Sequence, residues 1–224
     1  MISIVIPTLN EELNISKTLK KLSLIKGFKK YEYIIVDDNS IDNTKKEVNK
    51  FKKKLNIKFI NNKKKLGLGY ALKLGFSKAK NKYVLFLDAD LSISKNDIIK
   101  LIKKKKKENT IVVGSRYLVK SKIEGANYLK VFMSKFLNII ISNYFKIPII
   151  DMSHSFRIIS KNIPLKTKNY SHPGYFWETT IAAHKLNFKL EEIPIKFTDR
   201  KFGVSKNKTF KMIKSVIKTL YNIF

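Results

Sequence analysis

Short apolar runs alternate with helix-like segments through the first half of this chain. The apolar runs predict strands at residues 2–6, 33–36, 57–60, 83–87 and 110–113. A segment of helical length fills each interval, which gives the order β-α-β-α-β-α-β-α-β. Strands that alternate with helices in this way form a mostly parallel sheet with helices on both faces. The sequence therefore predicts an α/β, Rossmann-like fold.

The second half is predicted to contain fewer strands. We expect helices at residues 128–145 and 174–186, a short extended segment at 151–159 and a strand at 189–197. In the first half, Asn10 is expected to cap the helix after the first strand, and Leu13 to lie on that helix's buried face. No low-complexity linker or internal repeat divides the chain. Its 224 residues are therefore predicted to form a single domain.

The formal net charge is +30, which favours polyanionic partners such as nucleotides, nucleic acid or an anionic membrane. A generally lysine-rich composition would give the same charge without such a partner. Of the 47 basic residues only Arg116, Arg157 and Arg200 are arginine. A guanidinium binds phosphate or carboxylate through two parallel hydrogen bonds, so these positions are candidates for such contacts. For Arg157 we expect a carboxylate partner such as Asp151.

Several features indicate where the protein works. The chain has no cysteine, which fits a reducing compartment, and its first residues lack the pattern of a signal peptide. No apolar run reaches the roughly 18 residues that span a bilayer. We therefore expect a soluble or peripheral, cytoplasmic protein. The basic, amphipathic segment 207–224 is predicted to form a helix that packs on the core or lies on an anionic membrane surface.

Carboxylates directly follow two of the predicted strands. Asp37 and Asp38 end the second strand, and Asp88 and Asp90 follow the fourth. The carboxyl ends of parallel strands meet at one edge of a sheet, where ligands bind. Mg²⁺ usually takes one or two carboxylates plus substrate phosphates, and Mn²⁺ accepts similar ligands. This edge is therefore a candidate site for a metal-bound diphosphate.

Six motifs occur in order along the chain: IVIPTLNEE, IIVDDNSIDNT, LDADLS, GSRY, D-x-x-x-S-F-R and DRKFGVSK. Together they resemble glycosyltransferase family 2, the inverting transferases of the GT-A fold. The last three are most similar to the dolichol-phosphate mannose synthase and polyprenyl-phosphate glycosyltransferase branch. The resemblance covers residues 2–206. It implies a nucleotide-binding half at 1–117 and an acceptor half at 118–206, before the C-terminal helix at 207–224.

The resemblance implies two groups of donor-side residues. One group would line the nucleotide pocket, with Asp38 accepting a hydrogen bond from the base. The other would hold the diphosphate and an Mg²⁺ or Mn²⁺ ion, with Lys206 neutralising the leaving group. The first group is Pro7, Leu9, Glu11, Val36 and Asp38, and the second is Asp88, Ala89, Asp90 and Ser92.

On the acceptor side, the resemblance implies a phosphate site made of Arg116, Lys130, Ser134 and Arg200. The residues that it places in catalysis are Asp90, Arg116, Arg200 and Lys206. Three positions depart from the branch. Leu9 replaces an aromatic residue, Lys130 replaces an arginine, and His154 interrupts the usual S-G-F-R.

The resemblance implies that a hexose moves from a nucleotide-sugar, GDP-mannose or a UDP-sugar, to polyprenyl or dolichyl phosphate. Such a phosphate is already anionic near neutral pH, because its second pKa is about 6, so no general base is required. Transfer to a sugar hydroxyl of a surface glycan is the alternative, and it would need Glu178 or Asp151 as base. A nucleic-acid-binding protein is a third alternative. Because arginine is scarce and the acids cluster at strand ends, we expect no nucleic-acid partner. A lipid acceptor favours peripheral attachment at the cytoplasmic face of the membrane.

Overall fold

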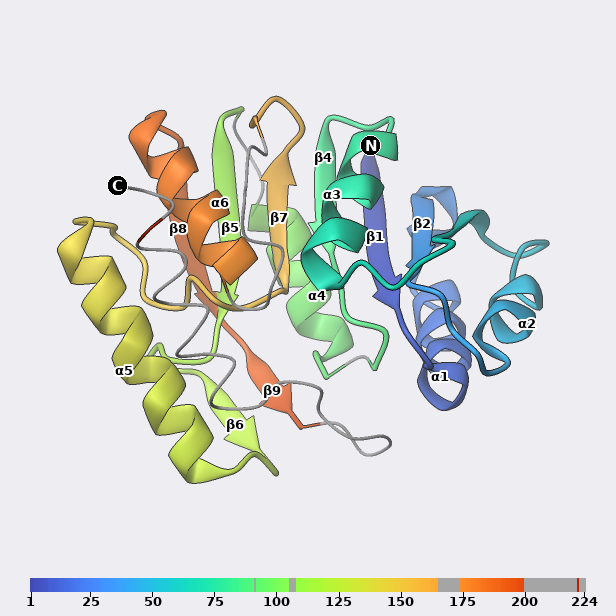
Figure 1. Ribbon diagram of the computed structural model, residues 1–224, viewed down its shortest axis with the longest axis horizontal. Helices are drawn as coiled ribbons and strands as arrows, with labels where there is room; N and C mark the ends of the chain where they lie inside the picture. Colours follow the sequence, from blue (N-terminus) through green and yellow to red (C-terminus); the bar gives the residue numbers. More distant parts are fainter. Residues whose placement is uncertain (91, 105–107, 165–173, 200–220, 222–224) are drawn as a thin grey trace.

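The structure is a computed structural model that describes residues 1–90, 92–104, 108–164, 174–199 and 221 of the chain. Within these residues a seven-stranded sheet has the strand order β3-β2-β1-β4-β7-β5-β8, and a second sheet pairs β6 with β9 (Figure 1). The strands are β1 (Ile2–Thr8), β2 (Glu32–Asp37), β3 (Asn56–Asn61), β4 (Tyr83–Phe86), β5 (Thr110–Ser115), β6 (Lys122–Glu124), β7 (Arg157–Ser160), β8 (Lys189–Pro194) and β9 (Lys196–Thr198).

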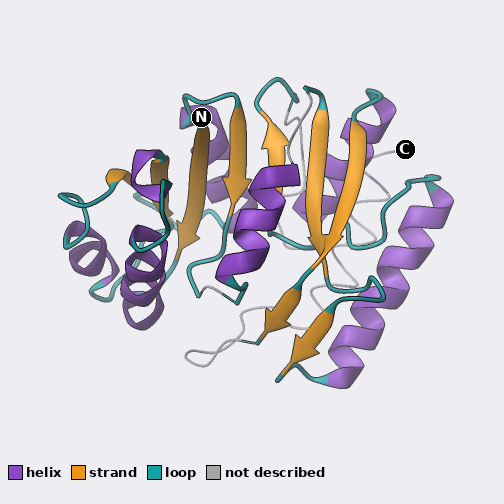
Figure 2. Cartoon of the chain, turned by 180° about the vertical axis from the view of Figure 1, so that it is seen from behind, coloured by secondary structure: helices purple, strands orange, loops and turns teal. Residues whose placement is uncertain are grey.

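Helices cover both faces of the large sheet, as predicted. They are α1 (Glu12–Ser23), α2 (Thr44–Asn49), α3 (Leu68–Lys78), α4 (Lys95–Lys104), α5 (Tyr128–Tyr144) and α6 (Gly174–Lys185), with a 3₁₀ turn η1 (Phe28–Lys30). Because side chains of a strand alternate between faces, Ile4 packs in one core layer and Val5 in the other. The layer of Ile4 contains residues of α1, α2 and α4, and the layer of Val5 contains residues of α3, α5 and α6 (Figures 1 and 2).

Parallel pairing dominates the sheet and confirms the predicted class. β1 pairs in parallel with both β2 and β4, β2 pairs with β3, and β5 pairs with β8. β7 is the exception, because it runs antiparallel between β4 and β5. The extended segment expected at residues 151–159 thus contributes a strand only from Arg157 onward. It places a strand of the second half of the chain inside the sheet of the first half.

Two expectations for the start of α1 are wrong. The helix begins at Glu12, with Glu11 rather than Asn10 at the N-cap position. Asn10 has a left-handed φ of 54°, and its side chain accepts a hydrogen bond from the backbone N–H of Ile41 instead. Leu13 is 58% exposed, whereas Ile15 is fully buried. The loop after β2 therefore determines how this helix starts.

The strand expected at residues 189–197 is divided in two. β8 ends at Pro194 in the large sheet, and β9 pairs in parallel with β6 in the small one. Between them, the N–H of Ile195 donates to Ser115, and its carbonyl accepts from Lys122. The chain thus leaves one sheet for the other within a single residue (Figure 2).

Some predictions lie outside the described residues. These are Arg200, Lys206 and the helix at 207–224, of which only Tyr221 is described.

Trp177 is fully buried in the core, and its indole N–H donates to Asn138. In the part of the chain that the structure describes, no helix is both long and apolar enough to cross a bilayer.

Gly75 allows α3 to lie close to the sheet. A Cβ atom at this position would come within 2.4 Å of Val5 Cγ1 and 3.2 Å of Val36 Cγ2. We expect Gly75→Ala to lower the free energy of unfolding. Overpacking usually costs about 1–3 kcal/mol, and the higher helix propensity of alanine recovers about 1 kcal/mol of this cost. Urea denaturation measures the change. Ser77→Ala, on the exposed side of the same helix, should stay within about 0.5 kcal/mol of wild type. Equal midpoints for the two variants would contradict this packing argument.

Candidate active site

The polar residues that end β1 and β2 are bonded to one another. Thr8 lies beside Asp37 in the parallel register, and its hydroxyl donates to the Asp37 carboxylate at 2.8 Å. The backbone N–H of Asp38 donates to the Thr8 carbonyl, also at 2.8 Å. The two strands therefore present their polar ends at the same edge of the sheet, as the sequence predicts.

Asp38 holds the loop that precedes α3. Its carboxylate accepts hydrogen bonds from the backbone N–H groups of Leu66 and Gly67, each at 2.8 Å, and from the Asn62 amide at 3.2 Å. Gly67 needs its left-handed φ of 92° to make this turn. Asp38 thus brings the start of α3 to the strand ends.

The other residues expected in the nucleotide pocket have different degrees of burial. Pro7, Leu9 and Glu11 are half-buried at the end of β1. The Glu11 carboxylate accepts from the Asn14 amide, and its N–H donates to Thr44. The side chain of Val36 is fully buried in the core layer beneath α3.

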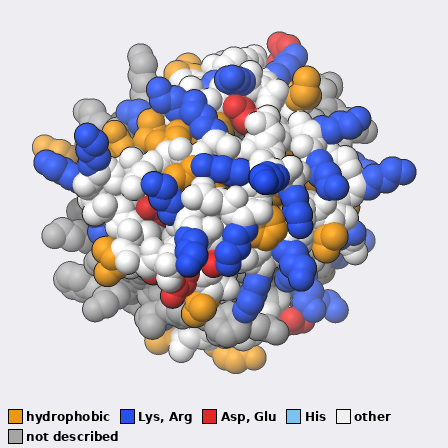
Figure 3. All heavy atoms as spheres, turned by 90° about the vertical axis from the view of Figure 1, so that its right-hand side faces the viewer, with side chains coloured by type: hydrophobic (Ala, Val, Ile, Leu, Met, Phe, Trp, Pro, Cys, Tyr) orange, Lys and Arg blue, Asp and Glu red, His pale blue; other side chains and the backbone are white. Residues whose placement is uncertain are grey.

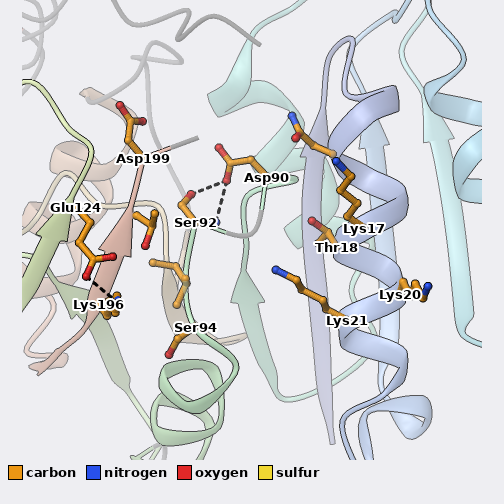
Figure 4. A pocket seen from close by; sticks show the side chains of 13 residues that line it. Lys17, Thr18, Lys20, Lys21, Asp90, Ser92, Ser94, Glu124, Lys196 and Asp199 are labelled. Carbon is orange, nitrogen blue, oxygen red and sulfur yellow. Dashed lines mark hydrogen bonds and ion pairs between the residues drawn. The ribbon is translucent and has the colours of Figure 1, made fainter. Parts of the chain in front are cut away.

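The turn after β4 holds Asp88 and Asp90 in fixed positions. Asp88 accepts a hydrogen bond from the Ser155 hydroxyl. Asp90 accepts from both the hydroxyl of Ser92, at 2.5 Å, and its N–H, at 3.2 Å (Figure 4). Between them Ala89 is buried, and its carbonyl accepts from Thr18 of α1. The two carboxylates are half-buried, and the turn that carries them is bonded to α1 through Ala89 and to the segment before β7 through Asp88.

A pocket of about 650 Å³ opens beside Asp90. One wall is α1, with Lys17 and Lys21, and the opposite wall carries Ser92 and Asp199. In Figure 4 the Lys21 side chain extends from α1 into the space between these walls. The volume suits a small molecule, and the pocket combines cations on one side with carboxylates on the other.

The chemistry of this edge fits a divalent cation that is shared with a substrate. Among the described residues, no group of three or more His, Cys, Asp or Glu side chains could hold a metal ion. Asp88 and Asp90 offer carboxylate oxygens, and the Ser92 hydroxyl donates a hydrogen bond to Asp90. Two carboxylates completed by phosphate oxygens are what Mg²⁺ usually takes. The residues present therefore fit a metal bound together with a diphosphate.

Arg116 follows β5 and forms a bidentate ion pair with Asp151. Its Nε donates to Asp151 Oδ2 at 2.8 Å, and its Nη2 donates to Oδ1 at 2.7 Å. Burial alone would lower the pKa of Arg116, but Asp151 and, more weakly, Asp88 raise it above its ordinary value. Burial alone would likewise raise the pKa of Asp151, but Arg116 holds it below the ordinary range. Both groups therefore stay charged at neutral pH.

Arg157 does not pair with Asp151, contrary to expectation, because Arg116 occupies that carboxylate. The Arg157 guanidinium is fully buried and donates to the carbonyls of Met152 and His154 and to the Thr180 hydroxyl. Burial lowers its pKa to about 9. The role that the structure gives this arginine is to hold the backbone of the segment before β7.

Two other acceptor-side residues lie on α5. Lys130 is exposed in its first turn, and Ser134 is buried, where its hydroxyl accepts from Tyr117 at 2.7 Å. A second pocket, of about 290 Å³, lies at the start of this helix, between Arg116 and the apolar side chains of Ile123, Ala126, Tyr128 and Val131. The structure thus places a guanidinium in a pocket of mixed lining, with Ser121 beside these apolar side chains.

The two candidate bases are both buried. Asp151 is fully buried and bonded to Arg116, and Glu178 is 5% exposed in α6. Sequence reasoning missed the roles of Thr18, Ser153 and Ser155, which bond to Ala89, Arg116 and Asp88. The alternation of Asp151, Ser153 and Ser155 in the sequence is the one signal that could have indicated the last two, and the structure forms a turn at Met152 and Ser153 there.

The family model for Glycosyl transferase family 2 matches residues 3–164, well over half of the chain. This chain belongs to glycosyl transferase family 2. A dolichol-phosphate mannosyltransferase of Pyrococcus furiosus is 32% identical to it over 134 residues, which cover 60% of this chain and 38% of that protein. Protein MJ1222 of Methanocaldococcus jannaschii, which is uncharacterized, is 31% identical over 218 residues, 92% of this chain and 84% of that protein. A further uncharacterized protein of that organism, MJ0544, is matched over 48% of its length. This family 2 chain therefore spans less than half of two of its curated relatives.

Solved structures share the fold of this family 2 chain. Glucosyl-3-phosphoglycerate synthase from Mycobacterium tuberculosis, in complex with Mn²⁺, uridine-diphosphate and glucosyl-3-phosphoglycerate, gives a TM-score of 0.69 at 18% identity, over 99% of this chain and 79% of that one. S. aureus TarS 1–349 gives 0.62 at 22% identity, over 88% of this chain and 60% of that one. The likeness to these structures confirms the predicted GT-A fold.

The Arg116–Asp151 pair should make the free energy of unfolding depend on pH in the acid range. Because the folded pKa of Asp151 is lowered, its contribution is complete above the ordinary carboxyl pKa of about 4 and is lost as pH falls through the folded value. We expect Asp151→Asn to cost about 3–5 kcal/mol at neutral pH, because it leaves a largely buried guanidinium without its counter-charge. The variant should also lose less stability than wild type between roughly pH 5 and pH 2. Urea denaturation at several pH values tests this, and parallel pH curves would contradict it.

Proposed function

We propose that this family 2 glycosyltransferase is a metal-dependent, inverting enzyme that moves a hexose from a nucleotide-sugar to a polyprenyl or dolichyl phosphate. One observation carries the proposal. The Arg116 guanidinium and the Asp88 carboxylate are bonded to Ser153 and Ser155, which are only two residues apart in one segment. This closeness supports a site for a metal-bound diphosphate next to a site for an acceptor anion.

Donor binding is supported by the two carboxylates and by the solved structures. Asp88 and Asp90 would hold Mg²⁺ or Mn²⁺, and the metal would offset the charge of the leaving diphosphate. The mycobacterial synthase was solved with Mn²⁺ and uridine-diphosphate, and the P. furiosus relative is a dolichol-phosphate mannosyltransferase. A UDP-sugar and GDP-mannose are thus the two donors to test first. Pro7, Leu9, Glu11, Val36 and Asp38 remain the proposed lining of the nucleotide pocket, and Ser92 a further metal ligand.

The reaction would exchange one bond at the anomeric carbon. An anionic oxygen of the acceptor phosphate attacks that carbon from the side opposite the diphosphate, and the bond to the diphosphate oxygen breaks. The configuration inverts, and no proton has to be removed from the acceptor. Arg116 would align the acceptor phosphate, together with Lys130, Ser134 and Arg200, and Lys206 would neutralise the leaving diphosphate.

An acceptor with an anionic head and an apolar body suits the pocket of 290 Å³ at the start of α5. Arg116 supplies the cation, and Ile123, Tyr128 and Val131 supply apolar walls. Transfer to a sugar hydroxyl is the weaker alternative because it needs a base. The pKa of Asp151 is lowered and its carboxylate is bonded to Arg116, so it is a poor proton acceptor. Glu178 remains as the candidate base for that alternative.

Binding of nucleic acid is a poor explanation of the charge. Figure 3 shows lysine and arginine side chains spread over the described part of one face of the molecule, with acidic and apolar side chains between them. A nucleic-acid site more often concentrates basic residues in one patch or stripe. A lysine-rich composition accounts for this distribution without a nucleic-acid partner.

An apolar stripe on α5 supports peripheral attachment to a membrane. Large side chains recur at almost every fourth residue along one side of this helix, and all are about half exposed or more. Lys130 and Lys135 are exposed on the same helix, so the surface could meet anionic headgroups as well as acyl chains. The stripe consists of Tyr128, Leu129, Phe132, Phe136, Ile140 and Tyr144. We propose that it rests on the cytoplasmic face of the membrane, with the acceptor pocket at its first turn.

Asp90→Asn tests the donor site. Removing one carboxylate charge from the metal site should lower transfer about 10²–10³-fold or more and abolish Mn²⁺-dependent binding of UDP or GDP. Calorimetry measures binding, and transfer to a short polyprenyl phosphate measures turnover with a panel of UDP- and GDP-sugars. Glu47→Gln, at an acid of α2 that pairs with Lys50, is the matched control and should behave as wild type. Wild-type turnover by Asp90→Asn would refute the proposed donor site.

The double variant Phe132→Ser/Phe136→Ser tests membrane attachment. The two rings stack in the middle of the stripe, with their centroids 6.3 Å apart. Their loss should weaken binding to phosphatidylglycerol vesicles about tenfold or more. Cosedimentation measures the binding. The control is Leu24→Ser/Leu186→Ser, which removes two exposed leucines that lie outside α5. If both double variants bind vesicles as wild type does, the stripe is not the membrane surface.

A further inference from the structure

The segment before β7 carries three polar side chains at alternate positions. Asp151, Ser153 and Ser155 are all at most 5% exposed, and each bonds to a residue that we place in the active site or to a partner of such a residue. The segment turns at Met152 and Ser153 before β7 begins. The three side chains form a row along it, and their hydrogen bonds place this row beside Arg116 and Asp88 at the carboxyl edge of the sheet.

The first two members of the row hold Arg116. Asp151 accepts from both Nε and Nη2 of the guanidinium and also from the backbone N–H of Arg116, at 2.9 Å. The Ser153 hydroxyl accepts a second hydrogen bond from Nη2 at 3.1 Å. These contacts use three of the five guanidinium N–H donors, and none of them uses Nη1. The side chain of Arg116 is 18% exposed, so part of it remains accessible to an anion.

The third member of the row holds Asp88. Its Oδ2 atom accepts from the Ser155 hydroxyl. Asp88 is one of the two carboxylates proposed to bind the donor's metal. A hydroxyl that donates to a ligating carboxylate fixes the orientation of that carboxylate, and losing such a partner commonly weakens metal binding about 10–100-fold.

Hydrogen bonds with Arg157 and Asn138 hold the backbone of this segment. Arg157 donates to the carbonyls of Met152 and His154, the residues between the three polar positions. Asn138 of α5 bonds to both the N–H and the hydroxyl of Ser153. A buried guanidinium with several acceptors leaves little freedom to the loop that it holds. The spacing between Ser153 and Ser155 is therefore rigid.

We propose that residues 151–155 form a positioning bracket that sets the distance between Arg116 and Asp88. The bracket would hold the acceptor anion in line with the donor's anomeric carbon, and it rests on the proposed function for the identity of both substrates. Ser153 and Ser155 are positioning residues, because they act through Arg116 and Asp88. In-line attack depends on such alignment.

The two ends of the bracket can be tested separately. Ser155→Ala should weaken binding of UDP or GDP with Mn²⁺ about tenfold in calorimetry, because Asp88 loses its orienting partner, and should change the KM for polyprenyl phosphate little. Ser153→Ala should raise that KM about fivefold or more and leave nucleotide binding unchanged. Ser155→Thr keeps the hydroxyl and should restore nucleotide affinity. The control is Ser160→Ala, a buried serine of β7 that bonds to Thr110, and it should match wild type in both measurements.

The outcomes separate the bracket from the proposed function. Equal nucleotide affinity in wild type and Ser155→Ala would overturn the bracket and leave the proposed function intact. A wild-type protein that binds nucleotide with Mn²⁺ but does not use polyprenyl phosphate would overturn the proposed acceptor, while the Ser155 measurement would still decide the donor end of the bracket. If Ser153→Ala does not fold, as judged by circular dichroism, the comparison of Ser155→Ala, Ser155→Thr and Ser160→Ala decides alone.

Discussion

Parallel pairing of β1 with both β2 and β4 determines where the polar residues of the donor side lie. Because Thr8 lies beside Asp37, and Val5 beside Phe86, the three strands present their carboxyl ends at one edge. Backbone hydrogen bonds from Asp38 to Thr8 and from Leu87 to Val5 continue this order beyond the strands. The turn that carries Asp88 and Asp90 and the loop before α3 both start from this edge, so their relative positions follow from the register.

The antiparallel strand β7 determines where the segment before it lies. It lies between β4 and β5, and its first residue, Arg157, pairs with Phe86 on one side and Val113 on the other. The segment before it must therefore lie between the ends of β4 and β5, where Asp88 and Arg116 follow. This arrangement explains how a stretch of the second half of the chain comes to bond with residues of the first half. The two halves of the chain share one sheet and one candidate site.

Much of the fold could be predicted from the sequence because the relevant signals are local. Each buried strand of the first half is a short, mostly apolar run, and Asp88 and Asp90 follow their strand directly. The partners of individual side chains could not be predicted in this way. Arg157 was expected to bond to Asp151, but the topology gives that carboxylate to Arg116, which is 35 residues away in sequence. Leu13 and Asn10 were misassigned because contacts with the loop after β2 determine how α1 starts.

By itself the sequence determined the α/β class, the carboxylates at the strand ends and the family, since these depend on residue type and order. Only the tertiary structure decided which arginine faces the site and which one supports the backbone. It also decided that Ser153 and Ser155 bond to Arg116 and Asp88. The physical reason is that a hydrogen bond or ion pair depends on atoms within about 3 Å of each other. When the partners are 30 to 70 residues apart in sequence, only the packing of strands brings them to that distance.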